Sequence, residues 1–291
     1  MPPVCESCSV AGTISAQGAK ETGLVEGTPV AAGYFDIDAA EFASGVADTE
    51  TLCLIAGTWS INERLAREAN TDYDKNKNTV TLGYRPGFFN IEESWPTSAS
   101  NFDWFVSNLL SSDDKDTARS EIYAKCNAAV AELDPNESDV VFVPYLYGAS
   151  YPSGADACFM GLTSYTTREH MLLAVYEGVC FSTLWNVHQL VGRDLTGRQV
   201  RLSGGVAKSH EWTQIMADVL GVPVETLANT ELSAQGAAMS AGVAAGIYSD
   251  FDDAIAQSVR LGETVYPRPE RVEIYRRKFE RYERALEALA V

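Results

Sequence analysis

The stretch Arg201–Val222, RLSGGVAKSHEWTQIMADVLGV, places two adjacent glycines between a strand-like run and a helix-like run. A glycine lets the backbone approach a neighbouring group within contact distance. Ser209 stands where an N-cap residue would precede a helix. Beyond it, apolar residues recur at the i, i+3, i+4, i+7 and i+8 spacing of an amphipathic helix, namely Trp212, Ile215, Met216, Val219 and Leu220. The pattern therefore predicts a strand, a tight turn at residues 203–205, and a helix.

The Gly204–Gly205 turn has two interpretations. In the first, bare backbone and the N–H groups beyond it are offered to an anionic ligand. In the second, it is a strand-to-helix turn that binds nothing, and the turn alone leaves both open. The residues match neither G-x-G-x-x-G nor G-x-x-x-x-G-K-[ST]. An NAD-binding Rossmann site and a Walker A loop are therefore disfavoured.

Two further stretches end a strand-like run in residues able to do chemistry. Residues 55–60 (IAGTWS) bring a glycine and hydroxyl groups together, as a loop that brackets phosphate oxygens does, although an ordinary polar turn has the same composition. Residues 33–38 (GYFDID) bring Asp36 to the end of an apolar stretch, where a carboxylate can take a proton from a substrate hydroxyl. The alternative is that Asp36 or Asp38 caps a following helix.

Composition narrows the class of protein. The 291 residues are 46% apolar and 21% charged, which is typical of a globular chain with a substantial core. The formal charge of −18 argues against nucleic acid or an anionic membrane surface as a partner. No apolar run of about 18 residues and no basic-then-apolar leader is present, so a cytoplasmic location is expected.

Cysteine and histidine spacing predicts no metal site. Four cysteines (Cys53, Cys126, Cys158 and Cys180) lie in apolar stretches and are expected to be buried reduced thiols. Cys5 and Cys8 form one C-x-x-C without the second pair that zinc sites usually have. The three histidines, His170, His188 and His210, share no metal-ligand spacing.

Periodicity predicts alternating strands and helices. Strands are expected at 27–33, 51–56, 139–144, 200–202 and 222–227, with 27–33 and 51–56 buried. Helices are expected at 38–46, 101–110, 116–133, 169–191, 231–247 and 269–289, and 66–98 is expected to be irregular or β. The 269–289 helix has 3-4 spacing over fewer than about three heptads, which favours a single docked helix over a coiled coil. The alternation indicates an α/β fold.

These signals occur together in one known family. Residues 157–162 (ACFMGL), followed after seven residues by His170-Met171 and then by 174–177 (AVYE), fill every constrained position of the second signature of the FGGY carbohydrate kinases. Residues 203–224 resemble the family's adenine-side loop and helix, and 231–246 (ELSAQGAAMSAGVAAG) resemble its closing helix. GTPVAAGYFD at 27–36 and IAGTWS at 55–60 resemble its base-bearing and phosphate-binding stretches. The likeness covers essentially the whole chain.

The resemblance implies an actin-like, ribonuclease-H-like α/β domain whose mixed sheet is of a five-stranded type flanked by helices. It also implies phosphorylation of a sugar hydroxyl with ATP and Mg²⁺. The roles it implies are a catalytic base at Asp36, phosphate contacts at Gly57 and Thr58, nucleotide packing at Gly204 and Gly205, and adenosine-side positions at Ser209 and Asp103.

The chain departs from the family pattern in two ways. Family members have two domains, and this chain resembles the second, with 1–28 expected to be a remnant or linker and 29–291 the nucleotide-binding domain. Activity is then expected to need the N-terminal domain, and an open cleft face would favour pairing of two copies. Tyr34 and Phe35 replace small residues before the base, a feature that leans towards the L-xylulose/3-keto-L-gulonate kinase branch of the family, or its xylulokinase branch, and a ketopentose-like sugar. The alternative is a non-catalytic nucleotide-binding or interaction module derived from a kinase.

Overall fold

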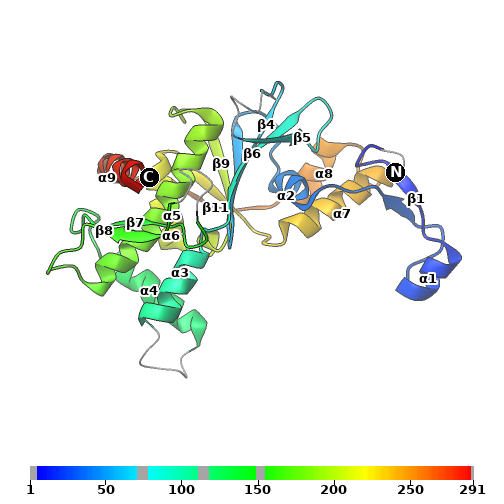
Figure 1. Ribbon diagram of the computed structural model, residues 1–291. Helices are drawn as coiled ribbons and strands as arrows, with labels where there is room; N and C mark the ends of the chain where they lie inside the picture. Colours follow the sequence, from blue (N-terminus) through cyan, green and yellow to red (C-terminus); the bar gives the residue numbers. More distant parts are fainter. Residues whose placement is uncertain (1–4, 71–77, 111–117, 149–154, 290–291) are drawn as a thin grey trace. The chain divides into compact units, whose positions relative to one another are not determined.

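The computed structural model describes residues 5–70, 78–110, 118–148 and 155–289 (Figure 1). The chain divides into two compact units, each described by itself below. Unit 1 comprises Met1–Cys53, Glu63–Ile91 and Leu227–Leu261, and unit 2 comprises Leu54–Asn62, Glu92–Thr226 and Gly262–Val291. Residues 5–28 fall within unit 1, so the expected separation of 1–28 from the remainder stays a prediction.

The principal sheet has the strand order β11-β10-β9-β3-β4-β6-β5 in the part of the chain that the structure describes. Its strands are β3 (Thr51–Ala56), β4 (Ser60–Ala66), β5 (Thr79–Leu82), β6 (Phe89–Trp95), β9 (Gln199–Gly204), β10 (Val224–Leu227) and β11 (Leu261–Val265). β10 pairs with β9 in parallel, with Val224 opposite Val200. The α/β class with a helix-flanked sheet is confirmed. The sheet has seven strands where the sequence implied five: residues 60–95 contribute β4, β5 and β6, β11 is added at one edge, and the strands expected at 27–33 and 139–144 lie outside this sheet.

Two small antiparallel ribbons lie outside that sheet. In unit 1, β1 (Val10–Thr13) pairs with β2 (Pro29–Ala31), on either side of α1 (Ala16–Thr22). The prediction of a buried strand at 27–33 is wrong, since β2 has only three residues and Val30 stays 41% exposed. The physical reason is that, within the described residues, β2 pairs with β1 alone, and this two-stranded ribbon leaves β2 largely exposed even though α7 contacts it. In unit 2, β7 (Val141–Val143) pairs with β8 (Cys158–Met160).

Unit 1 is built on two helices in close contact, α2 (Asp36–Ser44) and α7 (Leu232–Ala244), which run side by side in Figure 1. A Cβ on Gly236 would lie 1.8 Å from the carbonyl oxygen of Ala39, so only glycine permits this approach. Beside α8 (Phe251–Ser258), the rings of Phe42 and Tyr84 stack at 4.6 Å. The glycine of the E-x-x-x-x-G-A-A stretch is thus required by packing.

The start of α2 corrects the capping interpretation of the acids. The N-cap position is Phe35, and no side chain among the described residues caps the helix. Asp36 is the first helical residue and is exposed. Asp38 is buried, and its Oδ1 accepts a hydrogen bond of 3.0 Å from Nδ2 of Asn90. The helix therefore leaves the Asp36 carboxylate available for another role.

Unit 2 is built around α5 (Arg168–Val191), which is buried along most of its length, as its apolar composition predicts. Its N-terminus carries a capping box between Thr167 and His170. Around it lie α3 (Ser100–Phe105), the π-helical turn η1 (Val106–Leu110), α4 (Arg119–Ala131), the 3₁₀ turn η2 (Val206–Lys208), α6 (His210–Leu220) and α9 (Pro269–Leu289). Ser209 is the N-cap of α6, as expected, and accepts from the N–H of Trp212 at 3.1 Å.

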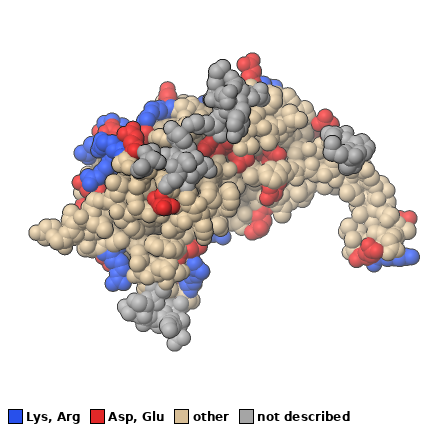
Figure 2. All heavy atoms as spheres, in the orientation of Figure 1, with Lys and Arg blue, Asp and Glu red and all other residues tan. Residues whose placement is uncertain are grey.

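The C-terminal helix α9 docks on its own unit, which confirms the single-helix interpretation. Its aromatic residues Tyr275, Phe279 and Tyr282 pack around Phe181 of α5, with ring centroids 5.6–6.3 Å from that ring. Seven of the chain's 22 Lys and Arg residues fall within residues 268–284, and Figure 2 shows them gathering over this helix. This segment is locally basic in a chain of net charge −18, and some of its side chains contact buried carboxylates.

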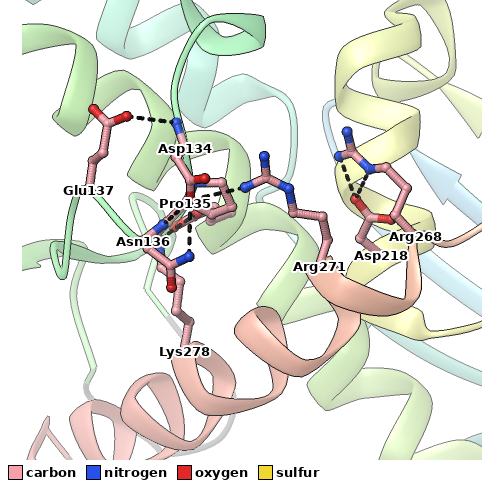
Figure 3. A network of polar contacts seen from close by, with 9 residues as sticks. Asp134, Pro135, Asn136, Glu137, Asp218, Arg268, Arg271 and Lys278 are labelled. Carbon is pink, nitrogen blue, oxygen red and sulfur yellow. Dashed lines mark hydrogen bonds and ion pairs between the residues drawn. The ribbon is translucent and has the colours of Figure 1, made fainter.

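Ion pairs hold the start and middle of α9 (Figure 3). Arg268 pairs with the fully buried Asp218 at 2.6 Å, and Arg271 pairs with Asp134 at 3.0 Å. The ammonium of Lys278 lies 2.6 Å from the buried carboxylate of Glu177 and donates to the carbonyl of Pro135 at 3.0 Å. Burial raises the pKa of Glu177 to about 7, and Lys278 opposes the rise. Docking therefore depends on compensated buried charge as well as on aromatic packing.

All six cysteines are free thiols. Cys53, Cys126 and Cys180 are buried, as expected, whereas Cys158 is partly exposed because it lies on the small β7–β8 ribbon. None of the helices in the described ranges combines the length and the apolar character that a bilayer crossing needs.

Candidate functional site

Three turns of unit 2 converge at the ends of β3 and β9. The turn after β3 contains Gly57 and Thr58, and the turn that begins at the last residue of β9 contains Gly204 and Gly205. A Cβ on Gly204 would lie 2.5 Å from the carbonyl carbon and oxygen of Ala56 and 2.7 Å from the nitrogen of Gly57. The structure thus brings the two glycine-bearing turns of the sequence analysis into direct backbone contact.

The loop before α3 fixes the turn after β3 from a third side. The N–H of Ala99 donates to the carbonyl of Gly57 at 2.8 Å, and the N–H of Ser98 donates to the carbonyl of Thr58 at 3.0 Å. The hydroxyl of Ser100 adds a bond of 3.1 Å to that same Thr58 carbonyl. These bonds occupy the carbonyls of the turn, while the side chain of Thr58 is exposed. The turn is held rigidly with its hydroxyl towards solvent.

Gly204 and Gly205 are glycines for different reasons. Gly204 has φ of +93°, a conformation that residues with a Cβ avoid, and it presses against the β3 turn. Gly205 has an ordinary φ of −64°, and a Cβ there would meet only the methyl group of Ala99 at 3.2 Å and the carbonyl oxygen of Ala56 at 3.8 Å. Backbone geometry explains Gly204. Gly205 is exposed, and the absence of its side chain keeps the adjacent cavity open.

That cavity has a volume of about 280 Å³, and Gly205 is one of the residues that line it. Its wall combines aromatic rings with a few polar groups: Ala99, Phe102, Asp103, Tyr123, Asn127, Tyr176, Gly205, Lys208, Ser209 and Trp212. Cavities that enclose whole drug-sized ligands are usually about 300–1,000 Å³, so this one suits a single planar ring system. Gly205, Ser209 and Asp103, three of the residues singled out from sequence, line it together.

The aromatic wall is itself tightly packed. The rings of Tyr176 and Trp212 stack with centroids 4.3 Å apart, and Phe102 meets both edge-on at 5.3 and 5.6 Å. The indole N–H of Trp212 donates to the carbonyl of Tyr176 at 3.0 Å. Burial raises the pKa of Tyr176, which keeps its hydroxyl protonated. The wall is therefore a rigid stacking surface rather than a loose apolar patch.

Polar groups of α3 and α4 complete the wall. The carboxylate of Asp103 accepts from the hydroxyl of Tyr123 and pairs with Arg119 at 2.9 Å. Burial, followed by the hydrogen bond to Asp103, raises the pKa of Tyr123, so this hydroxyl is also a donor. The side chain of Asn127, one helical turn beyond Tyr123, accepts from Tyr176 and Ser209.

Asp36 lies in unit 1, exposed at the start of α2. Of the two bulky residues before it, Tyr34 donates its hydroxyl to the carbonyl of Tyr84 at 2.6 Å and lies 3.0 Å from the thiol of Cys8. Burial raises the pKa of Tyr34, so the hydroxyl stays a donor. Phe35 is 62% exposed. Tyr34 therefore belongs to the packing of unit 1, and Phe35 carries the exposed bulk beside the carboxylate.

Sequence reasoning missed most of the cavity wall. In the sequence, Trp212 is marked only as part of an apolar helix face, and Tyr176 only as a position in a family signature. Asn127 and Lys208 have no local pattern that marks them, since α4 and the turn after β9 meet only in the folded chain. A second cavity of about 610 Å³ lies among the C-terminal parts of α5 and α6 and the body of α9, and none of the predicted site residues lines it. Across residues 5–289, excluding the undescribed stretches, no group of three or more His, Cys, Asp or Glu side chains is arranged to hold a metal ion.

Comparison with known proteins identifies the class. Residues 52–245 match the model of the FGGY family of carbohydrate kinases, C-terminal domain, and the chain therefore belongs to this family. A crystal structure of xylulose kinase from Rhodospirillum rubrum superposes with a TM-score of 0.87 at 29% identity, covering 99% of this chain and 57% of that one. A ligand-bound xylulose kinase from Lactobacillus acidophilus, at 19% identity, shares the fold with a TM-score of 0.89 over all of this chain and 58% of its own.

The curated relatives narrow the class further. The L-xylulose/3-keto-L-gulonate kinase of Escherichia coli K12 is 32% identical over 290 residues, covering 99% of this chain and 56% of that protein. The xylulose kinase of Bacillus subtilis 168 is 26% identical over 285 residues, covering 97% of this chain and 55% of its own length. The chain thus spans little more than half the length of the curated relatives it matches. The predicted family and fold are confirmed, and the roles of single residues remain to be tested.

Proposed function

We propose that this chain supplies the nucleotide-binding part of an ATP-dependent sugar kinase and carries its catalytic base. The observation that carries this proposal is the direct contact between the turns of Gly57 and Gly204, beside an aromatic cavity that Gly205 helps to line. A polyphosphate needs close backbone approach, and a purine needs a flat apolar slot. Both features adjoin each other within unit 2.

In the proposed complex the base of ATP lies in the cavity against its aromatic wall, and its phosphates extend to the glycine turns. The exposed hydroxyl of Thr58 and the N–H groups of these turns would bond phosphate oxygens. Lys208 lines the cavity, is exposed, and supplies a positive charge near the nucleotide. The magnesium ion enters as part of the second substrate, MgATP, and neutralises the phosphate oxygens.

Asp36 would act as the general base. As the sugar hydroxyl oxygen attacks the γ-phosphorus, the bond to the β–γ bridging oxygen breaks, and the hydroxyl proton passes to the carboxylate. The products are a sugar phosphate, ADP and a proton released from Asp36. Its exposure at the first turn of α2, with no capping bond to satisfy, supports this role.

The sugar is proposed to be ketopentose-like, because relatives carry the names L-xylulose/3-keto-L-gulonate kinase and xylulose kinase. Phe35, exposed beside Asp36, would limit the size of the sugar at that point. Because the chain spans 56% of its E. coli relative, a companion domain is proposed to hold the rest of the sugar. We also propose a cytoplasmic site of action and pairing of two copies where no companion covers the chain.

The test is a coupled assay for ADP release with a panel of ketopentoses and MgATP. It uses the chain alone and the chain mixed with the remaining N-terminal part of the E. coli relative. Asp36→Asn is expected to lower kcat by about 10²–10⁴-fold, the usual contribution of a general base. Asp252→Asn, which removes an exposed carboxylate from the first turn of α8, is the matched control and should retain activity.

Three outcomes separate the readings. Sugar-dependent ADP release that is lost in Asp36→Asn supports the kinase. If Asp36→Asn turns over at close to the rate of the unaltered protein, Asp36 is not the general base. ATP binding without phosphorylation of any sugar, even with the companion supplied, instead supports a non-catalytic nucleotide-binding module.

A further inference from the structure

The hydroxyl of Tyr34 belongs to a chain of hydrogen bonds that begins on α7 and runs through a thiol. The sulfur of Cys8 lies 3.0 Å from that hydroxyl and 3.3 Å from the hydroxyl of Ser240, which is fully buried. Tyr34 gives its single hydroxyl proton to the carbonyl of Tyr84 at 2.6 Å, so in the contact with Cys8 it accepts. The thiol therefore donates to Tyr34, and the hydroxyl of Ser240 donates to the sulfur.

The peptide segment on either side of Cys8 also holds the backbone that leads to Asp36. Two backbone hydrogen bonds make this connection, from the N–H of Gly33 to the carbonyl of Ser7 at 2.9 Å and from the N–H of Ala32 to the carbonyl of Ser9 at 3.0 Å. Both donors lie within four residues of Asp36 in the sequence. A change at the sulfur of Cys8 is therefore transmitted over a short distance to the start of α2.

A second thiol lies close to Cys8 in the chain. Cys5 precedes it by three residues and is exposed, whereas Cys8 is partly buried. The chain turns here, because the N–H and the hydroxyl of Ser9 donate to the carbonyl of Glu6 at 2.9 and 2.6 Å. A disulfide needs Cα atoms roughly 4.4–6.8 Å apart, a separation that residues three apart reach across a turn. The pair thus combines an accessible thiol that can react first with a shielded thiol that can resolve the product.

We propose that Cys5 and Cys8 form a reversible disulfide whose formation releases the segment before Asp36. The thiolate of Cys5 attacks one sulfur of a small-molecule disulfide and displaces the first small thiol. The thiolate of Cys8 then attacks the Cys5 sulfur and displaces the second. The two protein thiols are oxidised to one S–S bond with loss of two electrons and two protons, and the small disulfide is reduced to two thiols. Because the new disulfide has no S–H group, Tyr34 loses its donor and the chain of hydrogen bonds from α7 is interrupted.

Oxidation of the 291-residue chain in glutathione buffers of graded disulfide-to-thiol ratio tests the site. Free thiols are then alkylated, and peptide mass mapping locates the disulfides. The expected product is a bond between Cys5 and Cys8 that dithiothreitol reverses, while buried Cys53 and Cys180 remain thiols. Cys5→Ser should form no internal disulfide. If Cys5 and Cys8 stay alkylatable across the whole series, or carry only glutathione, the proposal is overturned.

Amide hydrogen exchange measured by NMR reports the structural consequence without a catalytic assay. The N–H groups of Ala32 and Gly33 are expected to exchange about tenfold or more faster in the oxidised protein. Cys8→Ala, which removes the S–H donor, should speed this exchange in the reduced protein, whereas Cys8→Ser keeps a donor and should not. Cys158→Ser, which alters a partly exposed thiol of unit 2, is the matched control and should change neither oxidation nor exchange. Equal exchange at both amides in the oxidised and reduced proteins contradicts the release of this segment.

The effect on catalysis rests on the proposed function, because it concerns the base at Asp36. In the coupled assay for ADP release, oxidation should lower sugar-dependent turnover by about tenfold or more, since a displaced base is poorly aligned with the hydroxyl. Dithiothreitol should restore the rate, and Cys5→Ser should be insensitive to oxidation. If neither redox state turns over a sugar, the proposed function fails, while peptide mapping and exchange still decide the disulfide. Unchanged turnover in a protein with the Cys5–Cys8 bond fully formed overturns the link to Asp36.

Discussion

Gly204→Ala tests whether the two glycine turns touch as described. The new Cβ would stand 2.5 Å from the carbonyl carbon and oxygen of Ala56 and 2.7 Å from the nitrogen of Gly57, all backbone atoms of a rigid turn. The residue also has φ of +93°, which costs a residue with a side chain roughly 1–2 kcal/mol. Forcing two packed segments apart typically costs ~1–3 kcal/mol more. The expected loss in free energy of unfolding is therefore about 2–5 kcal/mol.

Gly205→Ala is the matched control. Its φ of −64° suits alanine, and the nearest group is the methyl of Ala99 at 3.2 Å, which needs to move by only a few tenths of an ångström. We expect stability within about 0.5 kcal/mol of the unaltered chain but weaker nucleotide binding, because the new methyl group enters the cavity.

Urea unfolding followed by tryptophan fluorescence measures the free energies, and a thermal scan gives the shift in Tm. For a unit of this size, about 2–4 °C is lost per kcal/mol, so Gly204→Ala should melt on the order of 10 °C lower. If Gly204→Ala unfolds at the same urea concentration as Gly205→Ala, the contact between the two turns is refuted.

Two further predictions concern buried carboxyl groups. Glu41 is fully buried, and neither of its oxygens is hydrogen-bonded to a described residue; its pKa is raised by burial, then by Glu63 and Asp38. When the pKa of a carboxyl group is higher in the folded than in the unfolded protein, its contribution to stability is complete below the unfolded-state pKa and is lost as pH rises through the folded-state pKa. Glu41→Gln should therefore flatten the decline in unfolding free energy between pH 5 and 8. Parallel plots of unfolding free energy against pH for the two proteins would contradict this. Lys278→Met leaves Glu177 buried without its partner and should cost about 3–5 kcal/mol at pH 8 and less at pH 5, where Glu177 is protonated. Urea titrations at both pH values check this, and adding Glu177→Gln to Lys278→Met should restore part of the loss.

Local periodicity was enough to predict the helices that have one apolar and one polar face. The helix Pro269–Leu289 was predicted at the bounds it has, and α6 was predicted with Ser209 as its cap. Strand β2 was not, because its apolar residues follow the pattern of a buried strand, while the strand it pairs with in the described part of the chain, β1, is itself exposed. Periodicity indicates which side chains of a segment are apolar, but not which other element packs against them.

The candidate site divides along the same line. Gly57, Gly204 and Gly205 could be found because a glycine at the end of a strand indicates, from the local sequence alone, a tight turn or a close backbone approach. Asn127 could not be found, since its contact with Ser209 joins positions 82 residues apart and depends on how α4 meets α6. The interpretation of Asp36 or Asp38 as a helix cap is wrong. The carboxylate of Asp38 accepts a hydrogen bond from buried Asn90, which lies on a strand distant in the sequence.

A crystal structure of the chain with magnesium and a non-hydrolysable ATP analogue tests the central claim most directly. The account predicts phosphate oxygens bonded to the turns at 56–58 and 203–205, the purine within the ring-lined cavity, and the Asp36 carboxylate directed at the terminal phosphate. A nucleotide bound elsewhere, or an Asp36 side chain turned away from the terminal phosphate, would contradict it.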